Sequence, residues 1–194
     1  MPRDGADAKR RLRSALSERR RRVSPLDAAL AATVLASAAL EEPRVRRAGR
    51  VVLYAACEGE IPTRALFDGL GALRIERLLP RVEPRGIVWV RVTEWEALVP
   101  GGFGILEPIG AGEALGAADV VFVPGVGFDR NGSRLGRGGG HYDQALPAGA
   151  GSPWLVGVGY SFQWLAEVPC DSRDRHMDAI VTEHGWVWRS QGVR

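Results

Sequence analysis

The fold is decided by residues 119–146, which read DVVFVPGVGFDRNGSRLGRGGGHYDQAL. The first five are rich in valine and predict a short buried strand. A helix is expected from about Gly140 to Leu146, after a D-R-N-G turn and three consecutive glycines. A strand joined to a helix through a glycine-rich loop is typical of α/β proteins, in which ligands bind beyond the carboxyl ends of strands. The stretch therefore predicts an α/β fold with a ligand site in this loop.

Helices and strands alternate along the rest of the chain. We expect helices at residues 6–22, 25–40 and 63–70, and shorter helical turns at 94–99 and 162–165. Ser24 and Thr63 are the expected N-caps, and Pro25 lies in the first turn of its helix. The expected strands are residues 50–56, 74–79, 86–92, 154–160, 178–182 and 186–188, with a loop at 101–110. This order predicts a mostly parallel central sheet flanked by helices. No repeat or linker divides the chain, so we expect a single domain over residues 1–194 with flexible ends at 1–8 and 190–194.

The composition is that of an ordinary globular protein, with 45% hydrophobic and 25% charged residues. No apolar run reaches the roughly 18 residues needed to cross a bilayer. The charged N-terminus lacks the apolar segment of a secretory signal, and Cys57 and Cys170 have no metal-binding or disulfide-framework spacing. We therefore expect a reduced cytoplasmic setting, no membrane partner and a monomer as the default state.

Basic residues are concentrated at the start of the chain. The net charge is +3, but residues 1–24 carry nine basic and three acidic side chains. A nucleic-acid surface is one interpretation of this run. Because no aromatic residues are interleaved with it and no zinc-ligand spacing accompanies it, we favour a solvated helix face and expect no nucleic-acid partner.

The glycine loop has the residue types that bind a nucleotide with its metal. Arg134 and Arg137 precede the glycines at 138–140, and Asp143 follows them. Consecutive backbone N–H groups in such a loop form an anion nest, arginine clamps phosphate oxygens, and an aspartate can hold Mg²⁺ against the same phosphates. The loop has no lysine and is not a Walker A motif, and His141 occupies the third glycine position of a dinucleotide fingerprint.

The strings P-G-V-G-F-D, R-L-G-R-G-G-G and H-Y-D, in this order, resemble the signature of the 5-formyltetrahydrofolate cyclo-ligases, also called methenyltetrahydrofolate synthetases. The resemblance implies a Rossmann-like α/β sandwich. It also implies conversion of 5-formyltetrahydrofolate and ATP to 5,10-methenyltetrahydrofolate, ADP and phosphate, with Mg²⁺ as cofactor. In that reaction the formyl oxygen is phosphorylated and N10 of the folate closes the ring.

The resemblance extends to the N-terminal string K-R-R-L-R, which contains the chain's only lysine, Lys9. In the family the lysine and the last arginine of this element contact the ATP phosphates and the folate, which implies these roles for Lys9 and Arg13. The two lie four residues apart and would share one face of the expected helix. Lys9 and Arg137 are the implied catalytic residues.

The resemblance implies a complete set of site residues. The ATP-binding residues are Lys9, Arg10, Arg11, Leu12, Arg13, Arg134, Leu135, Gly136, Arg137, Gly138, Gly139, Gly140, His141 and Tyr142. The folate-binding residues are Arg13, Ala55, Glu60, Phe103, Arg137, Gly138, Gly139, Gly140 and His141. The Mg²⁺ ligands are Asp143 and Asp178, the second within the string D-R-H-M-D. A tyrosine is more usual in the family at the position of His141.

Two other interpretations compete with this one. His141 with Asp143, and His176 with Asp178, are both His-x-Asp pairs that could make a His₂Asp₂ site for Zn²⁺ or Mn²⁺ in a metal hydrolase. The glycine loop could instead bind another phosphorylated ligand, such as a sugar phosphate or a coenzyme A ester. Glu60 and Phe103 would then have no pterin to contact.

Overall fold

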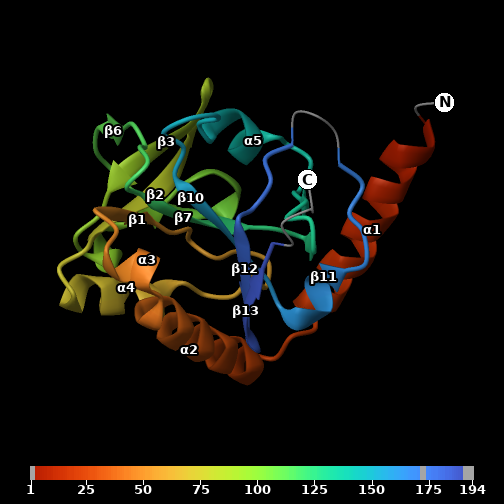
Figure 1. The fold of residues 1–194 in the computed structure, drawn as a ribbon, viewed down its shortest axis with the longest axis horizontal. Helices are drawn as coiled ribbons and strands as arrows, with labels where there is room; N and C mark the ends of the chain where they lie inside the picture. Colours follow the sequence, from red (N-terminus) through yellow and green to blue (C-terminus); the bar gives the residue numbers. More distant parts are fainter. Residues whose placement is uncertain (1–2, 171–173, 190–194) are drawn as a thin grey trace.

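Valine-rich segments form the central sheet of the protein (Figure 1). The computed structural model describes residues 3–170 and 174–189, without the side chains of residues 3–5 and Phe103. The strands of the main sheet within these residues, in spatial order, are β13 (Gly185–Trp188), β12 (Ala179–Thr182), β10 (Trp154–Val158), β7 (Val120–Pro124), β1 (Arg50–Val52), β2 (Glu76–Glu83), β3 (Gly86–Arg91) and β6 (Gly112–Glu113). The strands from β12 to β2 are parallel, and antiparallel strands complete both edges. The predicted mostly parallel α/β sheet is confirmed.

The middle strands are buried on both faces, because successive side chains point to opposite sides of a sheet. Val120 and Phe122 of β7 pack into one core cluster, and Val121 and Val123 pack into the other. The first cluster is covered by helices α2 (Pro25–Glu41) and α4 (Arg64–Ala72), at the bottom of Figure 1. The second lies beneath the short helix α5 (His141–Ala145).

Helix α1 (Arg3–Arg21) packs against a small second sheet rather than the central one (Figure 1). The strands of this sheet are β11 (Trp164–Leu165), β8 (Gly127–Asp129) and β9 (Arg134–Leu135). Leu16 of α1 is buried there beside Leu135. Since β8 and β9 lie within the glycine-rich stretch, this packing holds α1 beside the predicted ligand loop.

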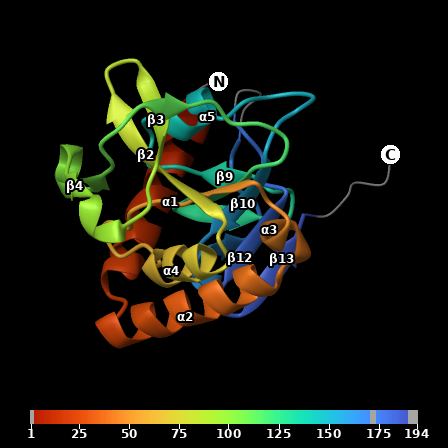
Figure 2. The ribbon, with the colours of Figure 1, turned by 90° about the vertical axis from the view of Figure 1, so that its left-hand side faces the viewer.

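The chain turns sharply between α1 and α2, by 102° (Figure 2). Ser24 caps α2 by accepting a hydrogen bond from Asp27 N, with Pro25 in the first turn, as predicted. No single described helix is long and apolar enough to cross a membrane. Helical residues 6–21 and 25–41 reach the length and apolar composition of a membrane span only when they are taken together, and the 102° bend lies between them.

Several predicted elements differ in detail. The strand expected at 50–56 leaves the sheet after Val52, and the helix expected at 94–99 is a single 3₁₀ turn, η1 (Trp95–Ala97). Thr63 precedes α4 but its hydroxyl donates to Tyr54 O instead of capping the helix. The turn expected at 162–165 is η3 (Ser161–Gln163) followed by β11.

The loop expected at 101–110 is partly ordered into secondary structure. It contains η2 (Gly102–Gly104) and β5 (Leu106–Glu107), which pairs with β4 (Val99–Pro100). α3 (Pro43–Arg46) is a further short helix directly after α2. Of the expected flexible ends, residues 3–8 are helical in α1, while residues 1–2 and 190–194 lie outside the described residues.

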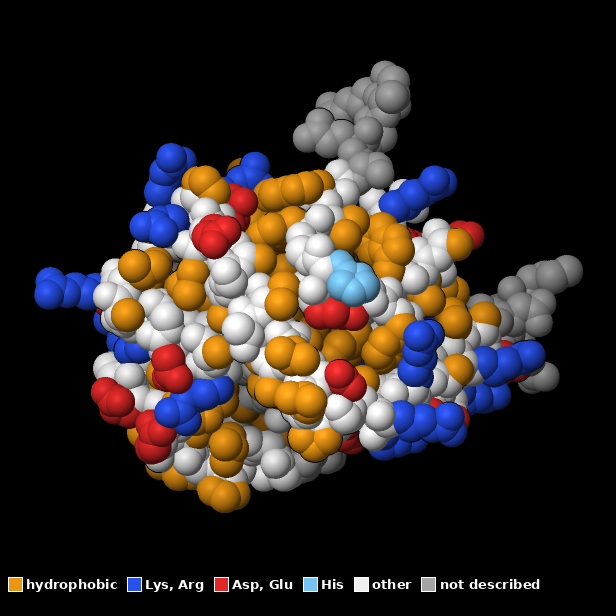
Figure 3. Space-filling view, turned by 90° about the horizontal axis from the view of Figure 1, so that it is seen from below, with side chains coloured by type: hydrophobic (Ala, Val, Ile, Leu, Met, Phe, Trp, Pro, Cys, Tyr) orange, Lys and Arg blue, Asp and Glu red, His pale blue; other side chains and the backbone are white. Residues whose placement is uncertain are grey.

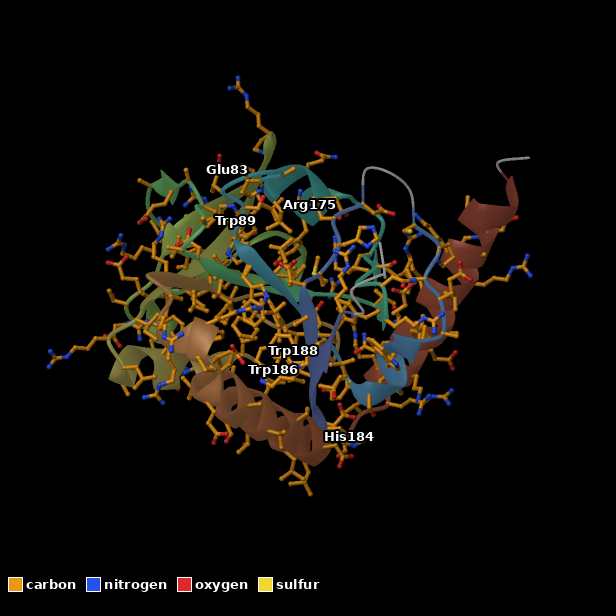
Figure 4. The ribbon with its side chains drawn as sticks, viewed as in Figure 1. Glu83, Trp89, Arg175, His184, Trp186 and Trp188 are labelled. Carbon is orange, nitrogen blue, oxygen red and sulfur yellow. The ribbon has the colours of Figure 1, made fainter. Side chains whose placement is uncertain are left out.

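The surface mixes apolar and charged side chains, and one edge of the central sheet carries an aromatic stack. Apolar side chains are scattered among charged ones on the face that contains α2, and basic side chains gather at the right-hand edge, where α1 lies (Figure 3). Trp186 and Trp188 of β13 lie close together (Figure 4) and stack on Trp154, with Arg44 over the Trp154 ring at 5.0 Å. This aromatic stack stiffens the β13 edge of the sheet.

Candidate functional site

A cavity of about 490 Å³ opens at the carboxyl ends of β1 and β7, beside the glycine loop. Its walls come from several parts of the chain. Four of them are α1 with Lys9 and Arg13, the segment after β1 from Tyr54 to Glu60, the hairpin of β2 and β3, and the stretch from Arg134 to Asp143. Ile105, Glu107, Pro124, Gly125 and Asp174 complete the lining. This is the place where α/β sheets bind ligands.

The cavity brings together most of the residues predicted to bind ATP and folate. Those that line it are Lys9, Arg13, Ala55, Glu60, Arg134, Leu135, Gly136, Arg137, Gly138, Gly139, Gly140, His141 and Tyr142, and the predicted metal ligand Asp143 lines it as well. They are drawn from segments more than 100 residues apart in sequence. A single cavity therefore contains both predicted halves of the site.

The remaining N-terminal residues lie elsewhere. Arg10 and Arg11 are exposed, and Leu12 packs with Leu16 against the small sheet. The helix explains this separation, because residues four apart share a face while those between them point away. Phe103 belongs to η2, but its side chain is outside the described part of the structure.

The glycine loop has backbone conformations that need glycine. Gly138 has φ +110° and Gly140 has φ +66°, which side chains with a Cβ rarely adopt. Arg13 Nε donates to Gly136 O at 2.8 Å and so ties α1 to the loop. Lys9 Nζ lies 3.1 Å from Asp174 Oδ2, at the same side of the cavity. This end of the cavity is basic and rich in backbone amides, which suits phosphate.

Arg137 pairs with the carboxylate predicted to hold the folate. Its Nη2 donates to Glu60 Oε1 at 2.9 Å and to Cys57 Sγ at 2.8 Å. Glu60 Oε2 also accepts from Cys57 N at 3.1 Å. Burial, together with the negative charge of Glu60, raises the pKa of the Cys57 thiol to about 11. The predicted phosphate-binding and folate-binding groups are therefore in direct contact.

The far wall of the cavity is more apolar and holds two neutral phenols. Tyr54 donates its hydroxyl to Ile61 O at 2.8 Å, and the Tyr142 ring lies 5.9 Å from that of Trp89. Burial, with the nearby charge of Glu60, raises the pKa of both tyrosines well above the ordinary value. Apolar side chains of Val82 and other hairpin residues complete this wall, which suits a flat ring.

The two predicted Mg²⁺ ligands lie in different places. Asp143 lines the cavity, where Oδ2 accepts from Arg134 Nη2 at 2.8 Å and Oδ1 accepts from Arg175 N at 3.1 Å. Asp178 accepts from Leu155 N at 2.8 Å and lines a separate open hollow. Asp174 lines both the cavity and the hollow. Of the aspartates among the described residues, those that line the cavity are thus Asp143 and Asp174, and Asp178 does not.

The His₂Asp₂ hypothesis is wrong for the described residues. His141 lines the cavity, whereas His176 lines the hollow and its Nδ1 lies 3.2 Å from Asn131 O. No group of three or more histidine, cysteine, aspartate or glutamate side chains in residues 3–170 and 174–189 is arranged to hold a metal.

Several cavity residues were missed by sequence reasoning. Cys57 and Glu58 adjoin Glu60 but carry no motif of their own, and Asp174 stands four residues before Asp178 in the same string. Arg20, which lies behind the cavity wall, is fully buried although it belongs to a run of four arginines. No periodic signal distinguishes it from its neighbours.

The fold and the cavity define an α/β protein in which a basic, glycine-rich loop and a more apolar wall share one site. Comparison with known families makes the assignment specific. The chain belongs to the 5-formyltetrahydrofolate cyclo-ligase family, whose model matches residues 6–183, and this is a family of ligases.

Named relatives and a solved structure agree with this assignment. The chain is 27% identical over 190 residues to 5-formyltetrahydrofolate cyclo-ligase of Mus musculus, which covers 91% of this chain and 94% of the relative. It is 33% identical to that of Mycolicibacterium smegmatis, over 69% of this chain and 74% of the relative. The NMR structure of 5,10-methenyltetrahydrofolate synthetase from Aquifex aeolicus is 33% identical, with a TM-score of 0.81 over 96% of this chain and 95% of that one.

Proposed function

We propose that this protein converts 5-formyltetrahydrofolate and ATP to 5,10-methenyltetrahydrofolate, ADP and phosphate. Membership of the cyclo-ligase family supports the reaction. The observation that carries the proposal is the contact between Arg137 and Glu60, because it joins the basic glycine-loop end of the cavity to the apolar end. A reaction that moves a phosphoryl group from a nucleotide to a folate needs both ends in one cavity.

The proposed mechanism is needed because the oxygen of the formyl group is a poor leaving group. The formyl oxygen on N5 cannot leave as oxide, so the γ-phosphoryl passes from ATP to that oxygen and ADP is released. The lone pair of N10 then attacks the activated formyl carbon, the five-membered ring closes, and the C–O bond breaks with release of phosphate and loss of the N10 proton. Phosphoryl transfer of this kind depends on positioning and charge stabilisation more than on covalent chemistry from the protein.

Each half of the cavity has a distinct role in this proposal. Lys9, Arg13 and Arg137 neutralise the phosphate oxygens, and the amides of the glycine loop cradle them. Arg137 and Lys9, two cations that line the cavity, are the proposed catalytic residues. Glu60 accepts hydrogen bonds from the N–H edge of the pterin, and Ala55 and the tyrosines pack on its ring.

Mg²⁺ fits the donor set of the cavity. It commonly uses one or two carboxylates together with phosphates and waters, so Asp143 and Asp174, which both line the cavity, would be its protein ligands. When bound, the ion neutralises charge on the nucleotide phosphates. Asp178 takes this role only if its segment moves from the hollow to the cavity.

We further propose that the protein acts as a monomer in the cytoplasm without a nucleic-acid partner. Its ligands are then ATP, Mg²⁺ and a reduced folate. Size-exclusion chromatography with light scattering checks the oligomeric state, and a mass near 21.0 kDa is expected.

The function is tested by following absorbance in the methenyl-folate band. Purified protein is mixed with 5-formyltetrahydrofolate and MgCl₂, with and without ATP. An ATP-dependent rise is expected, lost in Arg137→Ala but kept in Arg130→Ala, which removes an exposed arginine of the same stretch. Folded protein that binds ATP but gives no rise would refute the proposal and favour another phosphorylated ligand.

A further inference from the structure

Helix α1 buries one arginine completely. The side chain of Arg20 is 1% exposed, whereas its neighbours Arg19, Arg21 and Arg22 are exposed. An arginine is rarely buried to this degree unless its charge and its donors are matched by nearby groups. Its surroundings therefore indicate what it does.

Arg20 joins two loops that line the cavity. Its Nε donates to Glu58 O at 2.9 Å, in the segment after β1, and its Nη1 donates to Gly125 O at 3.4 Å, directly after β7. Gly59 has φ +75°, and a Cβ there would lie 2.8 Å from Arg20 O, so this segment packs directly on the end of α1. The guanidinium thus fixes the separation of the two loops from behind.

Two arginines lie close to the same oxygen of Glu60. Arg20 Nη1 lies 3.8 Å from Glu60 Oε1, and Arg137 Nη2 lies 2.9 Å from the same oxygen. The Arg137 side chain is 39% exposed and lines the cavity, whereas the Arg20 side chain is buried and does not line it. If Arg137 turns to a phosphate oxygen, Arg20 is the cation that stays beside Glu60. A carboxylate as buried as Glu60 is costly without a nearby positive charge.

We propose that Arg20 is a positioning residue that holds Glu60 in place for the folate while Arg137 engages phosphate. This inference rests on the proposed function, in which Glu60 contacts the pterin. It predicts that Arg20 sets the affinity for reduced folate much more than the affinity for ATP. Lysine cannot replace it fully, because an ammonium does not reproduce the fork that reaches both Glu58 O and Gly125 O.

The first test compares ligand affinities by calorimetry in Arg20→Lys, Arg20→Met, Glu60→Gln and the double variant Arg20→Met/Glu60→Gln. Arg21→Met, an exposed neighbour, is the matched control. We expect Arg20→Met to weaken 5-formyltetrahydrofolate binding by about tenfold or more, as for a lost charged hydrogen-bond partner, with ATP affinity within about threefold. Arg20→Lys should be intermediate, and the double variant should bind folate no more weakly than Glu60→Gln, because the two side chains act together.

A second readout does not depend on folate. In a Cys170→Ser background, the rate of alkylation of Cys57 reports the position of the segment that holds Glu60. Arg20→Lys and Arg20→Met should react several-fold faster than the parent, and Arg21→Met should not. If Arg20→Met does not fold, ligand affinity and Cys57 alkylation are both measured in Arg20→Lys.

The outcomes separate the two proposals. Folate affinity and Cys57 alkylation equal to the parent in the folded Arg20 variants would overturn the positioning role. Equal losses of ATP and folate affinity would also overturn it, since they indicate a general structural role. A parent protein that binds ATP but no folate would instead refute the proposed function, and alkylation alone would then decide whether Arg20 positions the segment.

Discussion

Replacement of Asp143 by asparagine should destabilise the protein as well as impair catalysis. Asp143 Oδ2 lies 2.8 Å from Arg134 Nη2, and the two side chains are 20% and 5% exposed. Asparagine keeps the shape and one acceptor oxygen but removes the negative charge. The guanidinium of Arg134 then remains buried without a carboxylate, which is the costly way to break a buried ion pair.

The size of the effect follows from the burial of the pair. Removing one partner of a buried pair costs on the order of 3–5 kcal/mol, and because Asp143 is partly exposed we expect the lower end, about 3 kcal/mol. Unfolding entropy for a chain of 194 residues is about 0.4 kcal/mol per degree, so the expected loss in Tm is about 7 °C. Circular dichroism melting measures it.

The control is Asp68→Asn, whose partner Arg64 is largely exposed and whose Tm should stay within about 2 °C of the parent. Adding Arg134→Met to Asp143→Asn should recover about half of the lost Tm, because no buried charge is left unpaired. A Tm for Asp143→Asn that falls no further than that of Asp68→Asn would refute the reasoning. Loss of activity in Asp143→Asn could then be assigned to its role at the metal alone.

Two other predictions concern packing and pH. Gly157→Ala should lose about 1–3 kcal/mol in urea unfolding, because its Cβ would lie 2.5 Å from the buried Phe128 ring. A Cβ at Gly49 would meet no atom within 4 Å, so Gly49→Ala should leave the free energy of unfolding nearly unchanged. Equal losses of unfolding free energy in the two variants would contradict this account. In Cys170→Ser protein, the raised pKa of about 11 keeps Cys57 protonated at neutral pH. Its alkylation at pH 8 should be about a hundredfold slower than for an unperturbed thiol and rise about tenfold per pH unit to pH 10. A plateau below pH 9 would contradict the assignment.

The central sheet was predictable because its strands carry strong local signals. Residues 120–124 are valine-rich and bounded by turn residues, and the strand they form is β7. The strands β8 and β9 gave no such signal, since each is two or three residues long and they flank a tight turn. Their existence depends on pairing with each other and with β11.

The site was predictable where a motif or a helical period fixed the geometry. Lys9 and Arg13 reach the same cavity because they are one helical turn apart. The choice between Asp174 and Asp178 was not predictable, since both belong to one string and the path of the backbone decides which faces the cavity. The burial of Arg20 was not predictable for a similar reason. Only the packing of α1 against the loops decides which arginine of the run is buried.

The most direct test of the account traces the formyl oxygen. 5-Formyltetrahydrofolate labelled with ¹⁸O in the formyl group is incubated with the protein, MgCl₂ and unlabelled ATP, and the released phosphate is analysed by mass spectrometry. The account predicts one ¹⁸O atom in each phosphate released, matched by one methenyl-folate formed. Methenyl-folate formed with unlabelled phosphate, or with no phosphate, would contradict it.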